Sequence, residues 1–141
     1  MRVAVSGFDA APDCTAFRLP VLGGEKAELA GVGAGPAITV PVRAGAAETD
    51  KVELVLIEED GSPWGATLPL KPEWTVLTLR PGDLRFFEHW QHPDGRGGPG
   101  DVVHVDRIAA VNVCFGSWLY GDQYATPHAV EIGDIGVSRG P

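Results

Sequence analysis

Residues 107–137, with the sequence RIAAVNVCFGSWLYGDQYATPHAVEIGDIGV, decide the fold of this chain. The first part of this stretch alternates with the two-residue period of a β-strand, which points successive side chains to opposite faces of a sheet. The apolar face that we expect in a core carries Ala109, Val111, Val113, Phe115 and Leu119. The opposite face would carry Asn112, Trp118 and Tyr120, an unusual trio for a face that meets only solvent.

Further runs of alternating apolar residues predict the other strands. They span residues 2–8, 15–22, 36–43, 51–57, 64–70, 74–79 and 129–137, the last interrupted by Gly133 and Asp134. Pro20 confines its own run to a sheet edge. The piece Lys26–Leu29 is compatible with a strand or with irregular structure, and any helix would be a short one near residues 82–87. We therefore predict one all-β domain over residues 1–141, an antiparallel two-sheet β-sandwich of the jelly-roll type.

The composition excludes some classes of partner. The formal net charge of −8 argues against nucleic acid and against an anionic membrane surface, because binding to either needs a basic surface. No run approaches the roughly 20 apolar residues of a membrane span, and the first residues lack the apolar core of a signal peptide. We expect either a cytoplasmic protein or a piece of a longer secreted one. Neutral polar ligands, of which sugars are the commonest class, stay compatible with the charge.

The two cysteines, Cys14 and Cys114, predict neither a redox motif nor a zinc site, because no Cys-x-x-Cys pair is present. Cys114 lies among small and apolar neighbours in the long strand, where a free, buried thiol is expected. A disulfide between the two stays open as the alternative.

The acidic residues and histidines form no catalytic pattern. The carboxylates at 58–60 share a predicted hairpin turn, which predicts a solvated turn and not an acid–base pair across a cleft. His89 and His92, with Asp94 close by, resemble a metal-binding set, but Pro93 and the glycine-rich stretch 91–100 predict a loop there. No GxSxG, HExxH or P-loop pattern is present. We expect no enzymatic activity, and a site built from His89, His92 and Asp94 is the rival hypothesis.

Two polar residues near the last strand need partners. Asp134 interrupts an apolar strand, so its carboxylate is expected either to accept backbone hydrogen bonds from a loop or to help bind a structural calcium ion. His128 follows Pro127 at the entry of that strand, where we expect it to hydrogen-bond the preceding loop.

The remaining candidates for a site are aromatic, because aromatic rings stack on the C–H faces of sugar rings while amides and carboxylates bond the hydroxyl groups. The predicted ligand-binding residues are Asn112, Trp118, Tyr120, Tyr124 and Trp90. Gly116 would leave a shallow hollow beside Trp118, and the loop 91–100 is long enough to wall it. The alternative is that these aromatic residues pack beneath that loop as part of the fold. Trp74 opens an alternating run and is expected in the core.

The order of motifs resembles a known family. The segment LVLIEEDGSPWGATLPL (54–70) precedes WTVLTLRPGDLRFF (74–87), a glycine-rich insert, RIAAVNVCFGSWL (107–119) and HAVEIGDIGV (128–137). Over residues 52–137 this order is similar to that of the galactose-binding-like β-sandwich domains attached to bacterial glycoside hydrolases, which are non-catalytic carbohydrate-binding modules.

The resemblance implies an accessory module that binds an oligo- or polysaccharide beside a hydrolase domain of the parent chain, in an extracellular or periplasmic location. It also implies a structural calcium ion held by Asp134, with Asp9 after the first strand as the second ligand. The closing motif of the family carries a pair of aspartates, and Gly133 replaces the first of them here. A similar sandwich in the complex I intermediate-associated proteins, which bind partners and not sugars, gives the alternative of a protein–protein interaction or structural module.

Overall fold

The structure is a computed structural model that describes residues 1–20 and 35–139, where β-strands alternate with loops and single 3-10 turns. The strands are β1 (Arg2–Val5), β2 (Cys14–Pro20), β3 (Pro36–Ala44), β4 (Lys51–Glu58), β5 (Pro63–Pro69), β6 (Thr75–Leu79), β7 (Arg85–Phe86), β8 (Ile108–Gly116), β9 (His128–Ile132) and β10 (Gly136–Arg139). The turns are η1 (Pro81–Asp83), η2 (Val105–Arg107), η3 (Ser117–Leu119) and η4 (Gly121–Gln123). The short helix expected near residues 82–87 is the turn η1, and the segment Lys26–Leu29 lies outside the described residues. Among the residues described, no helical turn has the length or the apolar character that crossing a membrane requires.

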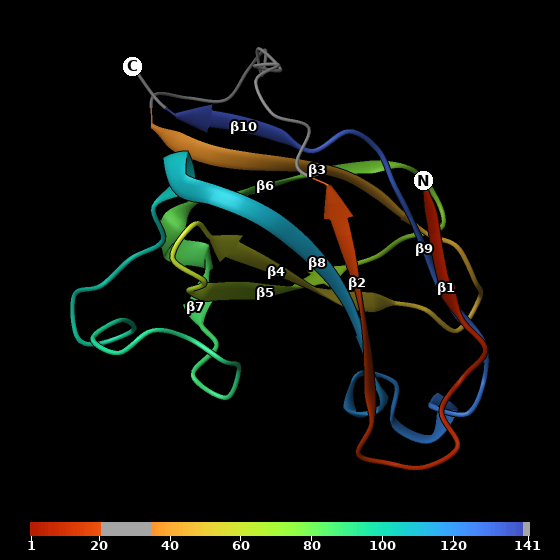
Figure 1. Cartoon of the computed structure of the whole chain (residues 1–141). Coiled ribbons are helices and arrows are strands. Elements are labelled where there is room, and N and C mark those ends of the chain that lie inside the picture. The colour runs from red at the N-terminus through yellow and green to blue at the C-terminus, as the bar shows by residue number, and fades with distance from the viewer. Residues whose placement is uncertain (21–34, 140–141) are drawn as a thin grey trace.

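The strands form two antiparallel sheets that pack face to face (Figure 1). Sheet A has the order β1-β9-β3-β10, and β6 pairs with the other side of β3. Sheet B has the order β2-β8-β4-β5-β7. The predicted antiparallel two-sheet β-sandwich is therefore confirmed, and so is the place of Pro20 in an edge strand.

The core lies between the sheets and is built by alternate residues of the central strands. The fully buried residues at its centre are Ile38, Val40 and Val42 of β3, Val52, Leu54 and Leu56 of β4, and Val111, Val113 and Phe115 of β8. Burying one such side chain stabilises the fold by about 1.5–3 kcal/mol. A shift of register by one residue would turn every one of these side chains outward, which is why the period-two pattern determines the pairing.

The interruption predicted near Gly133 is a β-bulge. Ile132 pairs with Val42 and Gly136 pairs with Thr39, so four steps along β9–β10 face three steps along β3 (136 − 132 = 4; 42 − 39 = 3). The extra residue ends one run of pairing and lets the chain resume it on the same partner strand. Asp134 lies in this bulge with its side chain exposed.

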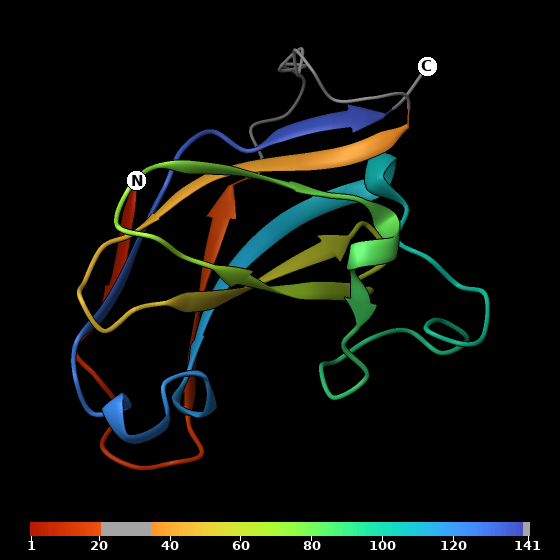
Figure 2. The same cartoon turned by 180° about the vertical axis from the view of Figure 1, so that it is seen from behind.

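The long strand β8 ends at Gly116, earlier than the sequence predicted. Gly116 pairs with Cys14, the first residue of β2. Beyond it, Ser117 donates its backbone N–H to the Asp13 carbonyl at 2.9 Å, and the Ser117 Oγ accepts from the Asp13 N–H at 2.9 Å. These bonds tie the chain to the β1–β2 loop, and it continues into η3 and η4 at the lower end of the sandwich (Figure 2).

Candidate functional site

Most of the candidate residues gather on the outer face of sheet B, by which we mean the side turned away from sheet A. Since Val52, Leu54 and Leu56 of β4 point into the core, Glu53 and Val55 point outward. By the same alternation, the outward residues of β8 are Asn112, Cys114 and Gly116, and those of β2 are Ala16 and Arg18. The predicted placement of Asn112 on a face opposite the core is therefore correct.

Trp118 lies on this outer face although it is not part of the strand. Its side chain covers Gly116, where an added Cβ would lie 2.4 Å from Trp118 Cε2. The residue is 52% exposed. A large aromatic surface is therefore presented to solvent at one end of the outer face of sheet B, and the missing side chain of Gly116 makes room for it.

Polar side chains lie on this face beside the apolar residues Val55 and Cys114. Glu53 is only 6% exposed, and its carboxylate faces the Arg85 guanidinium at 3.5 Å. Asn112 pairs in the sheet with Val55 on one side and with Arg18 on the other. Its Oδ1 atom is buried and has no hydrogen-bond donor within the described part of the chain.

Phe87 and Trp90 cover the β5 side of the same face. The Phe87 ring lies over Gly65, where a Cβ would come within 2.4 Å of its Cζ atom, and packs with Val55 and Cys114. Trp90 contacts Phe87 edge to face at 6.1 Å. Trp90 therefore flanks the outer face of sheet B, as the sequence predicted, whereas Phe87 was not among the predicted residues.

Both cysteines are free thiols, which confirms the prediction for Cys114 and removes the alternative of a disulfide. Cys14 is exposed and Cys114 is buried. Burial, with a smaller contribution from the nearby Glu53 carboxylate, raises the pKa of Cys114 to about 12.

Tyr120 and Tyr124 do not join this face, contrary to the prediction. Tyr120 is buried at the end of the sandwich, where its ring stacks on His128 at 3.6 Å and its hydroxyl donates to the Lys51 carbonyl at 2.9 Å. Tyr124 packs against the main core. The parity argument failed because η3 turns the chain by about a third of a circle per residue, instead of the half-turn of a strand.

His128 hydrogen-bonds the preceding loop, as predicted. Its Nε2 atom lies 2.9 Å from the Gln123 carbonyl, and its Nδ1 atom lies 3.1 Å from Thr49 Oγ1. These contacts hold the ring against which Tyr120 stacks, so both residues belong to the folded framework.

Trp74 is 50% exposed, so its predicted place in the core was wrong. It precedes β6, whose core-facing residues are Leu77 and Leu79, while Val76 points outward. The Arg43 guanidinium lies 5.1 Å from the centre of the Trp74 ring on the outer face of sheet A. The two-residue alternation of this run was predicted correctly, but Leu77 and Leu79 face the core, and Trp74 and Val76 do not.

The predicted calcium ligands lie far apart. Asp9 follows β1 near its Val5 end, which pairs with His128, whereas Asp134 follows β9 beyond Ile132, next to Met1. The two carboxylates therefore lie at opposite ends of the β1–β9 pair and do not fit one calcium site. Within residues 1–20 and 35–139, no group of three or more His, Cys, Asp or Glu side chains is arranged to hold a metal ion.

The rival catalytic set is not assembled either. His89 packs on Phe87 at 5.1 Å, whereas His92 packs on Phe86 at 4.8 Å. Phe86 and Phe87 belong to different clusters, one against the main core and one on the outer face of sheet B. The two imidazoles are thus directed to opposite sides of the sheet, and Asp94 is exposed in the loop.

The carboxylates at 58–60 were expected to be solvated, but Glu58 is 1% exposed. Arg96 of the glycine-rich loop donates to Glu58 Oε2 at 3.0 Å and to Glu58 Oε1 at 3.1 Å. It also donates to Asp60 at 2.6 Å and to Asp101 at 2.9 Å. A single arginine therefore ties the loop 91–104 to the β4–β5 turn, and we call Arg96, Glu58, Asp60 and Asp101 the Arg96 cluster. Glu58 pairs with Ile108, at the opposite end of β8 from Gly116, so the prediction that this loop walls a hollow beside Trp118 was wrong.

The cluster changes the acidity of its carboxyl groups. Burial alone would raise the pKa of Glu58, but hydrogen bonds from Arg96 and from the His104 backbone hold it below its ordinary 4.5. Despite the opposing effect of burial, hydrogen bonds from Ser62 and Arg96 lower the pKa of Asp60 to about 2. Both carboxylates therefore stay charged at neutral pH.

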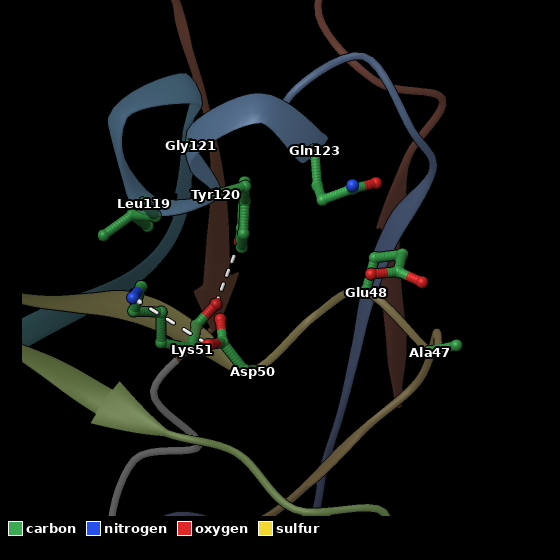
Figure 3. A pocket seen from close by; sticks show the side chains of 8 residues that line it. All are labelled: Ala47, Glu48, Asp50, Lys51, Leu119, Tyr120, Gly121 and Gln123. Atoms are coloured by element: carbon green, nitrogen blue, oxygen red, sulfur yellow. Dashed lines mark hydrogen bonds and ion pairs between the residues drawn. The ribbon is translucent and has the colours of Figure 1, made fainter.

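A pocket of about 280 Å³ opens where the β3–β4 loop meets η3 and η4 (Figure 3). Its lining residues are Ala47, Glu48, Asp50, Lys51, Leu119, Tyr120, Gly121 and Gln123. Lys51 lies on the same side of β4 as Glu53, so the pocket adjoins the outer face of sheet B. Tyr120 forms one wall of this pocket, and its hydroxyl group is already engaged (Figure 3).

Comparison with known proteins bears on the fold. No family model matches the sequence, and neither does any curated protein. Among solved structures, the chain is similar to the family 11 carbohydrate-binding module of the cellulosomal cellulase Lic26A-Cel5E of Clostridium thermocellum. The TM-score is 0.53 at 11% sequence identity, over 99% of this chain and 88% of that chain. The predicted resemblance to a carbohydrate-binding-module β-sandwich is confirmed at the level of the fold.

Proposed function

We propose that this protein binds an oligo- or polysaccharide through the outer face of sheet B and catalyses no reaction itself. The observation that carries the proposal is the half-exposed Trp118, laid over Gly116 on a face that also carries Asn112 and Glu53. An aromatic surface next to hydrogen-bonding groups is what a sugar ring requires, because its C–H faces are apolar and its rim is polar. The similarity of the fold to that of a carbohydrate-binding module supports this proposal.

We further infer that the protein acts as an accessory to a glycoside hydrolase outside the cytoplasm. The support is that the similar structure is a module of a cellulase. The parent reading frame tests this inference, because a hydrolase domain encoded beside this segment would support it. A free-standing gene for a cytoplasmic protein would contradict it.

Replacing Trp118 with alanine should weaken sugar binding about tenfold or more, because stacking on an aromatic ring contributes roughly 1–3 kcal/mol in the comparable case of nucleic-acid bases. Affinity electrophoresis in gels containing soluble β-glucan, xylan or galactomannan measures the change. Since the side chain is half exposed, the melting temperature should change little. Trp74→Ala is the matched control, because Trp74 is equally exposed but lies on sheet A. Equal affinity of the wild type and Trp118→Ala for a bound glycan would contradict the proposed site.

A second substitution tests the same surface without removing the tryptophan. In Gly116→Ala the new methyl group would overlap the Trp118 ring, so the ring must move away from the sheet. Any residue can adopt the backbone φ of −119° found at Gly116, so alanine should not strain the backbone there. The substitution should therefore mainly displace the Trp118 ring. We expect weaker glycan binding with little loss of stability. An unchanged affinity would show that the position of Trp118 does not matter for binding.

The alternative of a protein–protein interaction module has one observation in its favour. Trp74 and Val76, which is 64% exposed, lie two residues apart in the chain and both on the outer face of sheet A. Exposed apolar neighbours of this kind mark interaction sites when they form a patch. Concentration-dependent self-association of the wild type that Trp74→Ala abolishes, together with absent glycan binding, would favour this alternative.

A further inference from the structure

Two hydrogen-bond acceptors lie together at the centre of the outer face of sheet B. Glu53 pairs with Cys114, and Asn112 pairs with Val55, so the two polar side chains are diagonal neighbours on adjacent strands. Such neighbours lie roughly 7 Å apart, close enough for one ligand to reach both. Trp118 lies over Gly116, two residues beyond Cys114 on the same face.

Within the described part of the protein, both acceptors keep unused capacity for hydrogen bonds. The buried Oδ1 atom of Asn112 receives no hydrogen bond there. Glu53 is 94% buried (100 − 6), and residues 1–20 and 35–139 offer it only the ion pair with Arg85, at 3.5 Å. Leaving the buried Asn112 Oδ1 atom without a donor is unfavourable, because the atom has lost its water without gaining another partner. A ligand hydroxyl that donates to Asn112 would remove this penalty, and a second one could donate to Glu53.

We propose that Glu53 and Asn112 accept hydrogen bonds from hydroxyl groups of the glycan and thereby restrict the site to neutral sugars. This inference rests on the proposed function and names the ligand class of the same face. A hydroxyl group donates readily to a carboxylate, whereas a ligand carboxylate or sulfate has no proton to donate and adds a second negative charge. Repulsion of this kind is a common source of specificity, because it penalises the wrong ligand in addition to favouring the right one.

The basic residues nearby do not cancel this effect. Arg85 is already paired with Glu53, and Lys51 is paired with Asp50 at 3.9 Å. Arg18 is exposed on β2, where an ion pair contributes little because water screens it. The Arg85 guanidinium is exposed to water and lies 3.5 Å from Glu53, so it offsets the charge of the buried carboxylate only in part. The remaining charge of Glu53 is shielded from water and acts more strongly on a ligand at the face than the charge of Arg18 does.

The test compares neutral and acidic members of matched glycan pairs. Suitable pairs are hydroxyethylcellulose with carboxymethylcellulose, xylan with glucuronoxylan, and methyl-esterified with de-esterified pectin. The whole chain is titrated with each by calorimetry, as wild type, Glu53→Gln and Asn112→Leu. Both substitutions approximately preserve side-chain shape, and a melting curve verifies that each variant is folded.

We expect the wild type to bind the neutral member of a pair at least about tenfold more tightly than the acidic one. Glu53→Gln should weaken neutral binding about tenfold, because the hydroxyl group then donates to a neutral amide oxygen instead of a charged carboxylate, and should narrow the ratio of neutral to acidic affinity. Asn112→Leu should weaken neutral binding and leave that ratio nearly unchanged. Equal or tighter binding of acidic glycans by the wild type would overturn the inference and indicate Arg18 as an anion site. If neither substitution alters the affinity for neutral glycans, the inference about Glu53 and Asn112 is overturned and the proposed function stands. If the wild type binds no glycan, the inference and the proposed function are both overturned.

Discussion

Replacing Arg96 with methionine should lower the melting temperature by about 10 °C. The substitution removes every hydrogen bond that Arg96 donates to Glu58, Asp60 and Asp101. It leaves the nearly fully buried Glu58 carboxylate with only its contacts to His104, whose backbone N–H donates to Oε1 at 2.9 Å and whose Nδ1 atom lies 3.0 Å from Oε2. Removing one partner of a buried ion pair typically costs about 3–5 kcal/mol, because the remaining charge stays buried without compensation. In a domain of this size, that loss corresponds to a shift of roughly 10 °C.

Methionine keeps an apolar stem of similar length at position 96, so the effect reports the lost charge and hydrogen bonds. Arg107→Met is the matched control, because Arg107 is exposed and its side chain has no ion pair or hydrogen bond within the described residues. Thermal unfolding followed by circular dichroism measures both variants. A melting temperature of Arg96→Met equal to that of the control would show that the Arg96 cluster contributes nothing to stability.

The pH dependence of the same variant separates charge from packing. In the wild type, the pKa values of Glu58 and Asp60 are lower in the folded than in the unfolded state. Their contribution to stability is therefore present above about pH 4.5 and is lost as the pH falls toward 2. Without Arg96, the pKa of Glu58 should rise from its value in the wild type, because burial stays while the largest of the hydrogen-bond effects that oppose it is lost. Protonation at lower pH would then remove the poorly compensated charge. The stability deficit of the variant should shrink between pH 7 and pH 4, whereas a deficit caused by lost packing would stay constant.

Replacing Phe87 with alanine should have an effect of similar size on a different part of the sandwich. The ring is buried on the outer face of sheet B, where it covers Gly65 and packs on Val55 and Cys114. Truncating a buried phenylalanine costs about 3–5 kcal/mol, from lost burial and from the cavity that remains. We expect a clear fall in the free energy of unfolding in urea.

The thiol group of Cys114 gives a local readout of the same change. Its burial in the native protein raises its pKa and shields it from reagents, so it should react slowly with a disulfide reagent. In a Cys14→Ser background Cys114 is the single remaining thiol, and Phe87→Ala should make it react much faster under native conditions. An unchanged free energy of unfolding in Phe87→Ala would contradict the role of Phe87 in covering this face. So would a Cys114 thiol that reacts with the reagent as slowly in Phe87→Ala as in its parent.

The sequence by itself determined the sheets of this protein. The alternation in 107–137 predicts that Val111, Val113 and Phe115 of β8 face the core, because burial of one face of a strand requires a period of two. Ala109, which was expected beside them, is exposed where the pairing of β8 with β4 becomes irregular near Glu58. Gly133 and Asp134 predicted the interruption that the structure shows as a bulge. The free, buried Cys114 and the hydrogen-bonded His128 also follow from their neighbours in the chain.

Only the tertiary structure decided which polar and aromatic residues share a surface. Trp118 reaches the outer face of sheet B through a 3-10 turn and the missing side chain of Gly116, while Tyr120 turns away to stack on His128. The chain-local pattern cannot predict this, because the end of β8 depends on contacts with Asp13 more than a hundred residues earlier.

The same reason explains Trp74, Glu58 and Glu53. Trp74 sits in an alternating run whose two faces are both largely apolar, so the choice of the buried face depends on how β6 pairs with β3. In the sequence, Glu58 has the neighbours of a solvated turn residue. In the structure, Arg96 binds it from a loop that consists mostly of glycine and proline. Glu53 is recognisable in the sequence only as a charge among apolar neighbours. Its position beside Asn112 and Trp118 follows from the pairing of β4 with β8, which brings together residues that are far apart in the chain.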